Sequence, residues 1–302
     1  MRVNVICGFL GSGKTTLVRR ILGGRAGKER LAVIVNEFGD VGIDGEILQG
    51  HAIDMIELSA GCLCCTLKGS LVTAVEELRD KAGVERIVIE ATGVAQPGEL
   101  VEVLADPAIR DSVALGPLVT VVDAPKFPAL RKVLGEFYTA QVTRAGVLLL
   151  NKTDLATPGQ LDGVRREVTA LNPRATVVAT ERCDVELDMV LEGGSRAPEP
   201  SALEQGLASP APAASFTSFV ATTSFDADRA KVIRFFAGLP DAVVRAKGFM
   251  TIDGQPALVQ YAVGQLEITG APSPRAMNLV FILNGDGDQA GLKARLSETA
   301  RP

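Results

Sequence analysis

The residues from Gly8 to Thr15 have the spacing Gly-x-x-x-x-Gly-Lys-Thr, the pattern of a loop that cradles phosphate groups. An apolar run at 3–6 precedes the loop, and a helical pattern of apolar residues follows it. Glycines let backbone N–H groups face the phosphates, and the N-terminus of the following helix attracts anions. We predict that Lys14 reaches the β- and γ-phosphates and that the Thr15 hydroxyl binds Mg²⁺. The expected nucleotide contacts are Gly11, Ser12, Gly13, Lys14, Thr15 and Thr16.

A second motif, Asn151-Lys152-Thr153-Asp154, follows the apolar run 147–150 and matches the Asn-Lys-x-Asp pattern that reads guanine. The Asp154 carboxylate can accept hydrogen bonds from the ring N–H and the amino group of guanine, whereas adenine offers neither donor there. The stem of Lys152 could cover the face of the base, and Ala179-Thr180 could supply a second loop near it. GTP and GDP are therefore the predicted nucleotides. The alternative is an ordinary polar loop between a strand and a helix.

A third cluster places Cys62, Cys64 and Cys65 within four positions. The total of five cysteines is odd, which does not resemble a disulfide framework. Thiolates select Zn²⁺, Co²⁺ or Cu(I) over Mg²⁺, so we predict a transition-metal site. A structural zinc site and a redox role remain open. The only histidine, His51, either completes the metal shell or is an exposed loop residue.

The two other cysteines, Cys7 and Cys183, stand apart from this cluster. Cys7 lies in the strand before the phosphate loop and is expected to be a small buried hydrophobic residue. Cys183 lies in a predicted loop and has no evident partner in the sequence.

Carboxylates that could serve catalysis follow two predicted strands. Glu37 comes directly after the strand 31–36, where it could bind Mg²⁺, bind a carried metal or orient the attacking water. Glu90 follows the apolar residues 87–89 and ends the strand 86–90, at the position of the Asp-x-x-Gly motif of other P-loop GTPases, and is expected to bind Mg²⁺. The Gly93 N–H would contact the γ-phosphate, while Asp123 is the rival magnesium carboxylate. Lys14, Glu37 and Glu90 form the predicted catalytic set.

The pattern of apolar residues predicts an α/β fold with a doubly wound, mostly parallel P-loop GTPase sheet and a smaller C-terminal α+β domain. Strands are predicted at 3–6, 31–36, 53–58, 86–90, 118–123, 147–150 and 176–179, with helices at 70–82 and 160–171. Strands are also predicted at 216–222, 246–252, 257–263 and 277–283. Two further helices are predicted, one capped by Asp226 and one at 289–298. The predicted division is a GTPase domain at 1–191, a linker rich in Gly, Pro, Ser and Ala at 192–214, and the second domain at 215–302.

Charge and hydropathy exclude two classes of partner. The formal net charge is −5, and Lys and Arg form no block, so neither nucleic acid nor an anionic membrane is expected as a partner. No apolar run approaches the ~20 residues that span a bilayer. The phosphate-loop strand begins at the first residues and leaves no room for a cleavable signal. A cytoplasmic protein is expected.

Taken together, the motifs resemble those of the CobW-family GTPases, which are related to the nickel-handling GTPases of urease and hydrogenase maturation. The residues that carry the resemblance stand in family order at 8–17, 36–39, 61–65, 90–93 and 151–154. The resemblance implies a GTP-hydrolysing metallochaperone that binds zinc or cobalt at Cys62, Cys64 and Cys65 and delivers it to a client protein. A monomer and a homodimer are both compatible with it. Because this chain has no histidine after His51, a histidine-rich metal store in its C-terminal half is not expected.

Two other functions fit parts of the sequence. One is a GTP-switched protein-binding module in which the cysteines hold a structural zinc, so that metal affinity would not depend on the nucleotide. The other is a P-loop transferase that passes phosphate to a small molecule. The guanine motif at 151–154 argues against the transferase.

Overall fold

The computed structural model describes residues 1–25, 27–36, 54–58, 66–81, 83–193, 216–271 and 277–301. These residues form two compact units, one up to residue 193 and the other from residue 216 onward. The predictions for Glu37, His51, Cys62, Cys64 and Cys65, and for most of the linker, lie outside the described residues.

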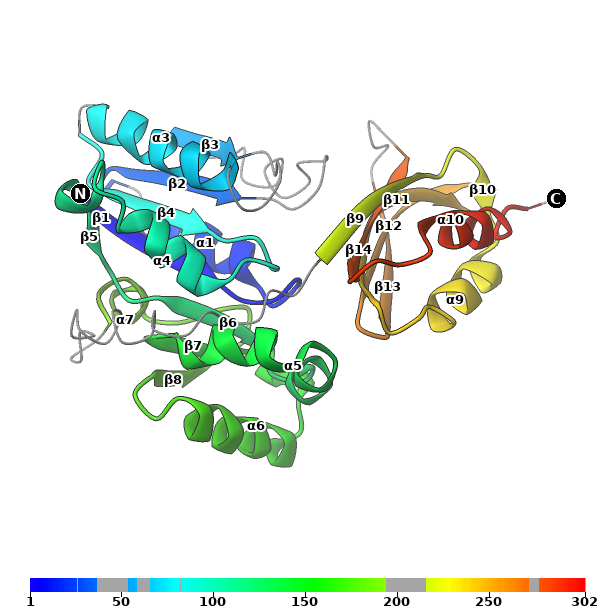
Figure 1. Ribbon diagram of the computed structural model, residues 1–302. Coiled ribbons are helices and arrows are strands. Elements are labelled where there is room, and N and C mark those ends of the chain that lie inside the picture. Colours follow the sequence, from blue (N-terminus) through cyan, green and yellow to red (C-terminus); the bar gives the residue numbers. More distant parts are fainter. Residues whose placement is uncertain are drawn as a thin grey trace. The chain divides into compact units, whose positions relative to one another are not determined.

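The first unit is built on a parallel sheet with the strand order β3-β2-β4-β1-β6-β7-β8, and β5 pairs beside β1 (Figure 1). The strands are β1 (Arg2–Cys7), β2 (Leu31–Asn36), β3 (Asp54–Leu58), β4 (Arg86–Glu90), β5 (Ala114–Leu115), β6 (Val119–Asp123), β7 (Val147–Asn151) and β8 (Thr176–Ala179). Every strand pair in this sheet is parallel. The predicted fold is therefore confirmed. β5 was not predicted from the sequence.

Helices cover both faces of this sheet, because most of its strands are apolar on both sides. The helices are α1 (Lys14–Arg25), α3 (Thr66–Asp80), α4 (Pro97–Leu104), α5 (Phe127–Thr143), α6 (Pro158–Leu171) and α7 (Leu187–Glu192). α3 and α4 share one buried core with β1, β2 and β4, and α1 and α7 share another core on the opposite side of these strands. A doubly wound arrangement follows.

The start of α6 shows how local sequence sets a helix boundary. The Thr157 hydroxyl accepts a hydrogen bond from the Gln160 N–H, the Gln160 side chain accepts one from the Thr157 N–H, and Pro158 fills the first turn. This capping box satisfies two N–H groups that have no partner inside the helix, so α6 begins two residues before the predicted boundary.

The second unit is a sheet of order β13-β12-β11-β14-β9, in which these neighbours are antiparallel. Its elements are β9 (Phe216–Thr222), β10 (Asp226–Ala227), α9 (Arg229–Ala237), β11 (Val243–Ile252), β12 (Gln255–Ala262), β13 (Gln265–Gly270), β14 (Asn278–Asn284) and α10 (Gln289–Ser297). α9 and α10 pack on one face of this sheet around Phe281. The predicted α+β domain is confirmed, although β10 and the exposed edge strand β13 were not predicted.

The predicted cap of α9 was wrong by two residues. Asp226 lies in β10, and Asp228 caps the helix by accepting a hydrogen bond of 2.9 Å from the Lys231 N–H. Bonds from backbone N–H groups, that of Lys231 first, hold the pKa of Asp228 below its usual value. Both aspartates suit an N-cap by type, and only the path of the chain distinguishes them.

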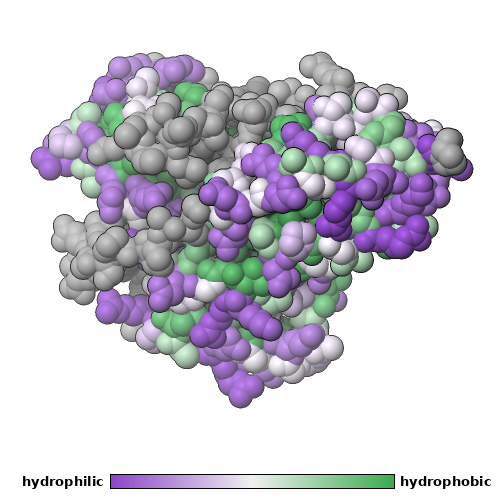
Figure 2. All heavy atoms as spheres, turned by 45° about the vertical axis from the view of Figure 1, so that its right-hand side comes forward, coloured by the Kyte–Doolittle hydropathy of each residue, from purple (hydrophilic) through white to green (hydrophobic). Residues whose placement is uncertain are grey.

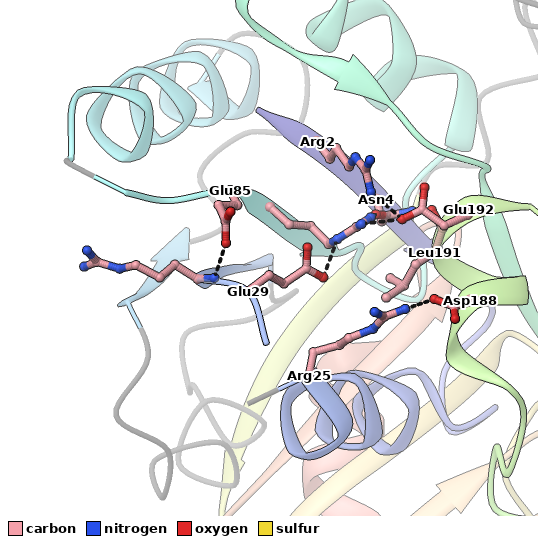
Figure 3. A network of polar contacts seen from close by, with 10 residues as sticks. Arg2, Asn4, Arg25, Glu29, Glu85, Asp188, Leu191 and Glu192 are labelled. Atoms are coloured by element: carbon pink, nitrogen blue, oxygen red, sulfur yellow. Dashed lines mark hydrogen bonds and ion pairs between the residues drawn. The ribbon is translucent and has the colours of Figure 1, made fainter. Parts of the chain in front are cut away.

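A buried polar network lies at the amino ends of β1 and β4, the edge of the sheet opposite the phosphate loop (Figure 3). The Arg86 side chain is 1% exposed and donates to Asn4 Oδ1 at 2.5 Å, to Glu192 Oε1 at 2.5 Å and to Glu29 Oε1 at 2.9 Å. The Asn4 amide donates in turn to the Leu191 carbonyl at 2.9 Å. The network holds the end of α7 against the sheet and is a structural feature.

Large apolar side chains are mostly buried in both units. On the face seen in Figure 2, hydrophilic residues cover much of the described surface, with apolar residues between them. Among the described residues, Leu155 and Ile233 are the large hydrophobic residues that stand exposed. No described helix is both long enough and apolar enough to cross a membrane.

Candidate nucleotide site

The phosphate loop connects β1 to α1 through three glycines with positive φ: Gly8 at +135°, Gly11 at +76° and Gly13 at +119°. A Cβ atom on Gly8 would overlap the Val121 carbonyl oxygen, and one on Gly13 would lie 2.5 Å from Asn151 Nδ2. Side chains are therefore excluded at both positions by backbone conformation and by space. The loop follows the carboxyl end of β1 and leads into the first turn of α1, as the sequence predicts.

Two of the predicted phosphate and magnesium residues lie at the start of α1. Lys14 is 7% exposed, and its Nζ donates to the Phe9 carbonyl at 3.4 Å. The Thr15 hydroxyl donates to Glu90 Oε1 at 2.7 Å, and Glu90 is 4% exposed at the carboxyl end of β4. The structure thus brings together the two oxygen donors, Thr15 and Glu90, that were predicted to bind Mg²⁺.

Gly93 packs directly against the phosphate loop. A Cβ atom at this position would lie 2.7 Å from the Leu10 backbone nitrogen. Only a glycine allows this approach without displacing the loop. The segment after Glu90 and the phosphate loop are therefore in contact.

Asn151 joins three segments at the carboxyl edge of the sheet. Its amide Nδ2 donates to the Ser12 carbonyl at 2.8 Å, and its Oδ1 accepts from the Cys183 N–H at 2.9 Å and from the Thr180 hydroxyl at 3.2 Å. The side chain is 2% exposed. An amide is both donor and acceptor, so this one group ties the phosphate loop to the loop after β8. Sequence reasoning placed Asn151 at the base and missed this contact.

The last two residues of the predicted guanine-reading motif lie in a short turn, η2 (Thr153–Leu155), after β7. Lys152 has left-handed backbone angles, with φ +63°, and its Nζ lies 2.6 Å from Asp123 Oδ2. The Thr153 N–H and hydroxyl both donate to the Thr180 carbonyl, at 3.2 and 3.1 Å. Asp154 is exposed. The motif therefore packs against Thr180, one of the two residues predicted for a second loop near the base.

Asp123, the rival magnesium carboxylate, has other partners. Oδ2 pairs with Lys152, and Oδ1 accepts from the Lys126 N–H at 3.3 Å. The Thr15 hydroxyl, by contrast, bonds to Glu90. The geometry favours Glu90 over Asp123 as the carboxylate beside Thr15.

Cys183 has a partner that the sequence did not reveal. Its Sγ donates to the Gly13 carbonyl at 3.4 Å, and burial raises the pKa of the thiol to about 12, although the positive charges of Arg20 and Lys152 oppose the shift. Arg20 also holds this loop by donating to the Arg182 carbonyl at 2.7 Å. A lone cysteine in a loop gives no sequence signal for such a contact.

Cys7 is the buried residue that was expected, 1% exposed. Burial raises the pKa of its thiol to about 12, and the positive charge of Lys14 opposes the shift. Within the ranges that the structure describes, no group of three or more His, Cys, Asp or Glu residues could hold a metal ion.

Comparison with known families agrees with this geometry. The sequence pattern of a family described as CobW/HypB/UreG, nucleotide-binding domain, matches residues 2–179. The chain belongs to this CobW family. The pattern of the cobalamin synthesis protein CobW C-terminal domain matches residues 216–300 of the same CobW-family chain.

Several curated relatives of this CobW-family protein align with it. The zinc chaperone CobW of a Sinorhizobium species is 31% identical, and the alignment covers 97% of this chain and 95% of the relative. The zinc chaperone YjiA of Escherichia coli K12 is 32% identical, with 84% and 83% covered. The zinc-regulated GTPase metalloprotein activator 1 of Schizosaccharomyces pombe is 38% identical over 59% of this chain and 45% of its own length. The family, together with the relative whose name describes it as a GTPase, supports GTP hydrolysis by this protein.

Proposed function

We propose that this CobW-family protein is a GTP-hydrolysing metallochaperone. It binds zinc or cobalt at Cys62, Cys64 and Cys65 and passes the metal to a client protein under the control of the bound nucleotide. The observation that supports the nucleotide-binding part of this proposal is the 2.8 Å hydrogen bond from Asn151 Nδ2 to the Ser12 carbonyl. This bond holds Asn151 of the Asn-Lys-x-Asp motif against the phosphate loop. The proposed binding of a transition metal is supported by the three clustered thiols and by relatives named zinc chaperones.

At the nucleotide site, different groups of the chain would bind the phosphates, the base and Mg²⁺. Backbone N–H groups of the phosphate loop and Lys14 bind the phosphates, and Asp154 pairs with the guanine edge. The Thr15 hydroxyl and the Glu90 carboxylate are hard oxygen donors 2.7 Å apart, a donor set that suits Mg²⁺. When bound there, Mg²⁺ would neutralise charge on the phosphates. The full set of proposed nucleotide contacts is Gly11, Ser12, Gly13, Lys14, Thr15, Thr16, Gly93, Asn151, Lys152 and Asp154.

Two residues, Gly93 and Glu37, would couple GTP hydrolysis to binding of the carried transition metal. Gly93 packs on the phosphate loop, so its segment is placed to respond to the γ-phosphate. Glu37 would orient the attacking water or serve one of the metal ions. Metal and GTP would then tighten each other's binding by the same factor, because linkage between two sites is reciprocal.

The proposed domain division places nucleotide and metal chemistry in one part of the chain. Residues 1–191 form the GTPase domain, 192–214 a linker and 215–302 the C-terminal domain. Either a monomer or a homodimer of this chain would bind the client protein.

The deciding experiment is a titration of the reduced protein with Zn²⁺ or Co²⁺ in the presence of Mg²⁺-GTP, Mg²⁺-GDP or no nucleotide. Co²⁺–thiolate absorption and competition with a chelator report the metal affinity. GTP is expected to tighten metal binding at least tenfold, a coupling of about 1.4 kcal/mol. Equal affinity in all three states would replace the metallochaperone with a GTP-switched binding module that holds a structural zinc.

Two substitutions assign the residues. Cys64→Ser is expected to weaken metal binding strongly and to spare nucleotide affinity, whereas the control Cys7→Ala, outside the cluster, leaves metal binding unchanged. Asp154→Ala is expected to lower the preference for GTP over ATP, measured by competition against a fluorescent guanine nucleotide. Unaltered metal binding in Cys64→Ser would remove the cysteines from the site.

A further inference from the structure

A buried carboxylate, that of Asp123, pairs with the lysine of the proposed guanine-reading motif. Asp123 is the last residue of β6 and is paired in register with Asn151, the last residue of β7. It is 3% exposed, and its Oδ2 lies 2.6 Å from Lys152 Nζ. The family motif Asn-Lys-x-Asp does not include this residue, and the sequence suggested magnesium as its partner.

The backbone of Lys152 is held as firmly as its ammonium group. Its φ of +63° and ψ of +38° lie in the left-handed region, which a residue with a side chain adopts at a cost. The residues on both sides are hydrogen-bonded, because the Asn151 carbonyl accepts from the Ala124 N–H at 3.0 Å and the Thr153 N–H donates to Thr180. With the backbone fixed and the Nζ bound to Asp123, the four-carbon stem between them has little freedom.

We propose that Asp123 is a positioning residue for guanine nucleotides, which acts by holding the Lys152 stem where it packs on the face of the base. The inference rests on the proposed reading of guanine by residues 151–154. A free lysine loses rotamer entropy when it settles against a ligand, whereas a lysine that is already tethered loses much less. Asp123 would therefore raise nucleotide affinity without touching the nucleotide.

This role predicts a pattern that a magnesium ligand would not produce. GDP and GTP share the base, so loss of the tether weakens both equally and leaves the Mg²⁺ requirement unchanged. A magnesium ligand would instead affect the triphosphate more, and its loss would be relieved by a higher Mg²⁺ concentration. Glu90 already bonds to the Thr15 hydroxyl, which agrees with the positioning role.

The test is a double-mutant cycle on the full chain with Asp123→Ala, Lys152→Met and the two combined, using competition of GDP and GTP against a fluorescent guanine nucleotide. Each single substitution is expected to weaken both nucleotides about tenfold, and the double variant is expected to be no weaker than either single one. Asp123→Asn, which keeps an acceptor without the charge, is expected to lie between Asp123→Ala and the wild type. The matched control is Glu167→Ala, which removes the 2.7 Å pair with Arg131 between α5 and α6 and is expected to leave both affinities unchanged.

Three outcomes would overturn the positioning role. They are affinities within twofold of wild type in Asp123→Ala, with or without a loss of stability, additive losses in the double variant, and a GTP-selective loss relieved by Mg²⁺. Failure of the proposed function has a different signature, because the wild-type protein itself would then bind ATP as tightly as GTP.

Discussion

Asn151→Asp tests the contact between the proposed guanine-reading motif and the phosphate loop. The substitution keeps the shape of the side chain and the oxygen that accepts from the Cys183 N–H and the Thr180 hydroxyl. It replaces the Nδ2 donor, 2.8 Å from the Ser12 carbonyl, with a second acceptor. Two acceptors then face each other in a site where the side chain is 2% exposed.

The cost follows from what is lost. The Ser12 carbonyl loses its donor, and a buried group without a partner costs about 1–3 kcal/mol. The buried charge adds to this, so we expect a loss of about 2–4 kcal/mol in the free energy of unfolding at neutral pH. The defect should shrink toward pH 4, because a protonated carboxyl group can donate to Ser12 again. Nucleotide affinity should fall at least tenfold, since the phosphate loop is displaced.

Denaturant unfolding between pH 4 and 8, together with GDP affinity, measures both effects. Asn172→Asp is the matched control, because its buried amide donates to the carbonyls of Val142, Thr143 and Ala145, outside the phosphate and guanine motifs. The control should lose comparable stability and keep its nucleotide affinity. If Asn151→Asp retained wild-type GDP affinity, or if the control lost as much affinity, the assigned role of Asn151 would be refuted.

Three further predictions concern buried groups. Burial raises the pKa of Cys7 and Cys183 to about 12, so the unfolded chain releases these protons first, and each thiol should lower stability by about 1.4 kcal/mol per pH unit from about pH 9 upward. Denaturant unfolding should show a flatter alkaline decline when either is replaced by alanine. Tyr138→Phe should raise the free energy of unfolding by about 1 kcal/mol, because the Tyr138 hydroxyl is buried and has no hydrogen-bond partner among the described residues; a loss of stability would contradict this. Arg86→Met should cost about 1–3 kcal/mol in the same assay, because the buried Asn4 Oδ1 and the Glu29 carboxylate lose their donor while Glu192 keeps its pair with Arg2, and a neutral result would show that the network relaxes.

Local patterns in the sequence were enough to predict most of the strands, with ends mostly within one residue, and the phosphate loop. A buried parallel strand is a short apolar run, and Gly8 and Gly13 mark backbone angles that other residues avoid. The position of Glu90 beside Thr15 also follows from the predicted fold. The phosphate loop, which leads to Thr15, follows the carboxyl end of β1, and Glu90 ends β4, the parallel neighbour of β1. These features depend on neighbours in the chain or on the regular geometry of the sheet.

Local pattern was not enough where two candidates had the same chemistry or where a strand lay at an exposed edge. Asp226 and Asp228 are equally good caps by type, and the turn of the chain selected Asp228. β13 has only two partly buried apolar residues, Leu266 and Ile268, and they alternate with polar residues over too short a stretch to predict a strand. The functions of Glu37 and of the clustered cysteines stay predictions.

The amino-acid sequence by itself determined the fold class and the family, and it predicted the nucleotide loops, because the residues of each motif lie close together in the chain. Only the tertiary structure decided that Asn151 binds Ser12, that Cys183 packs on Gly13 and that Asp123 pairs with Lys152. These partners are separated by 139, 170 and 29 residues. Side-chain hydrogen bonds form between any donor and acceptor that folding brings together, so no spacing in the sequence records them in advance.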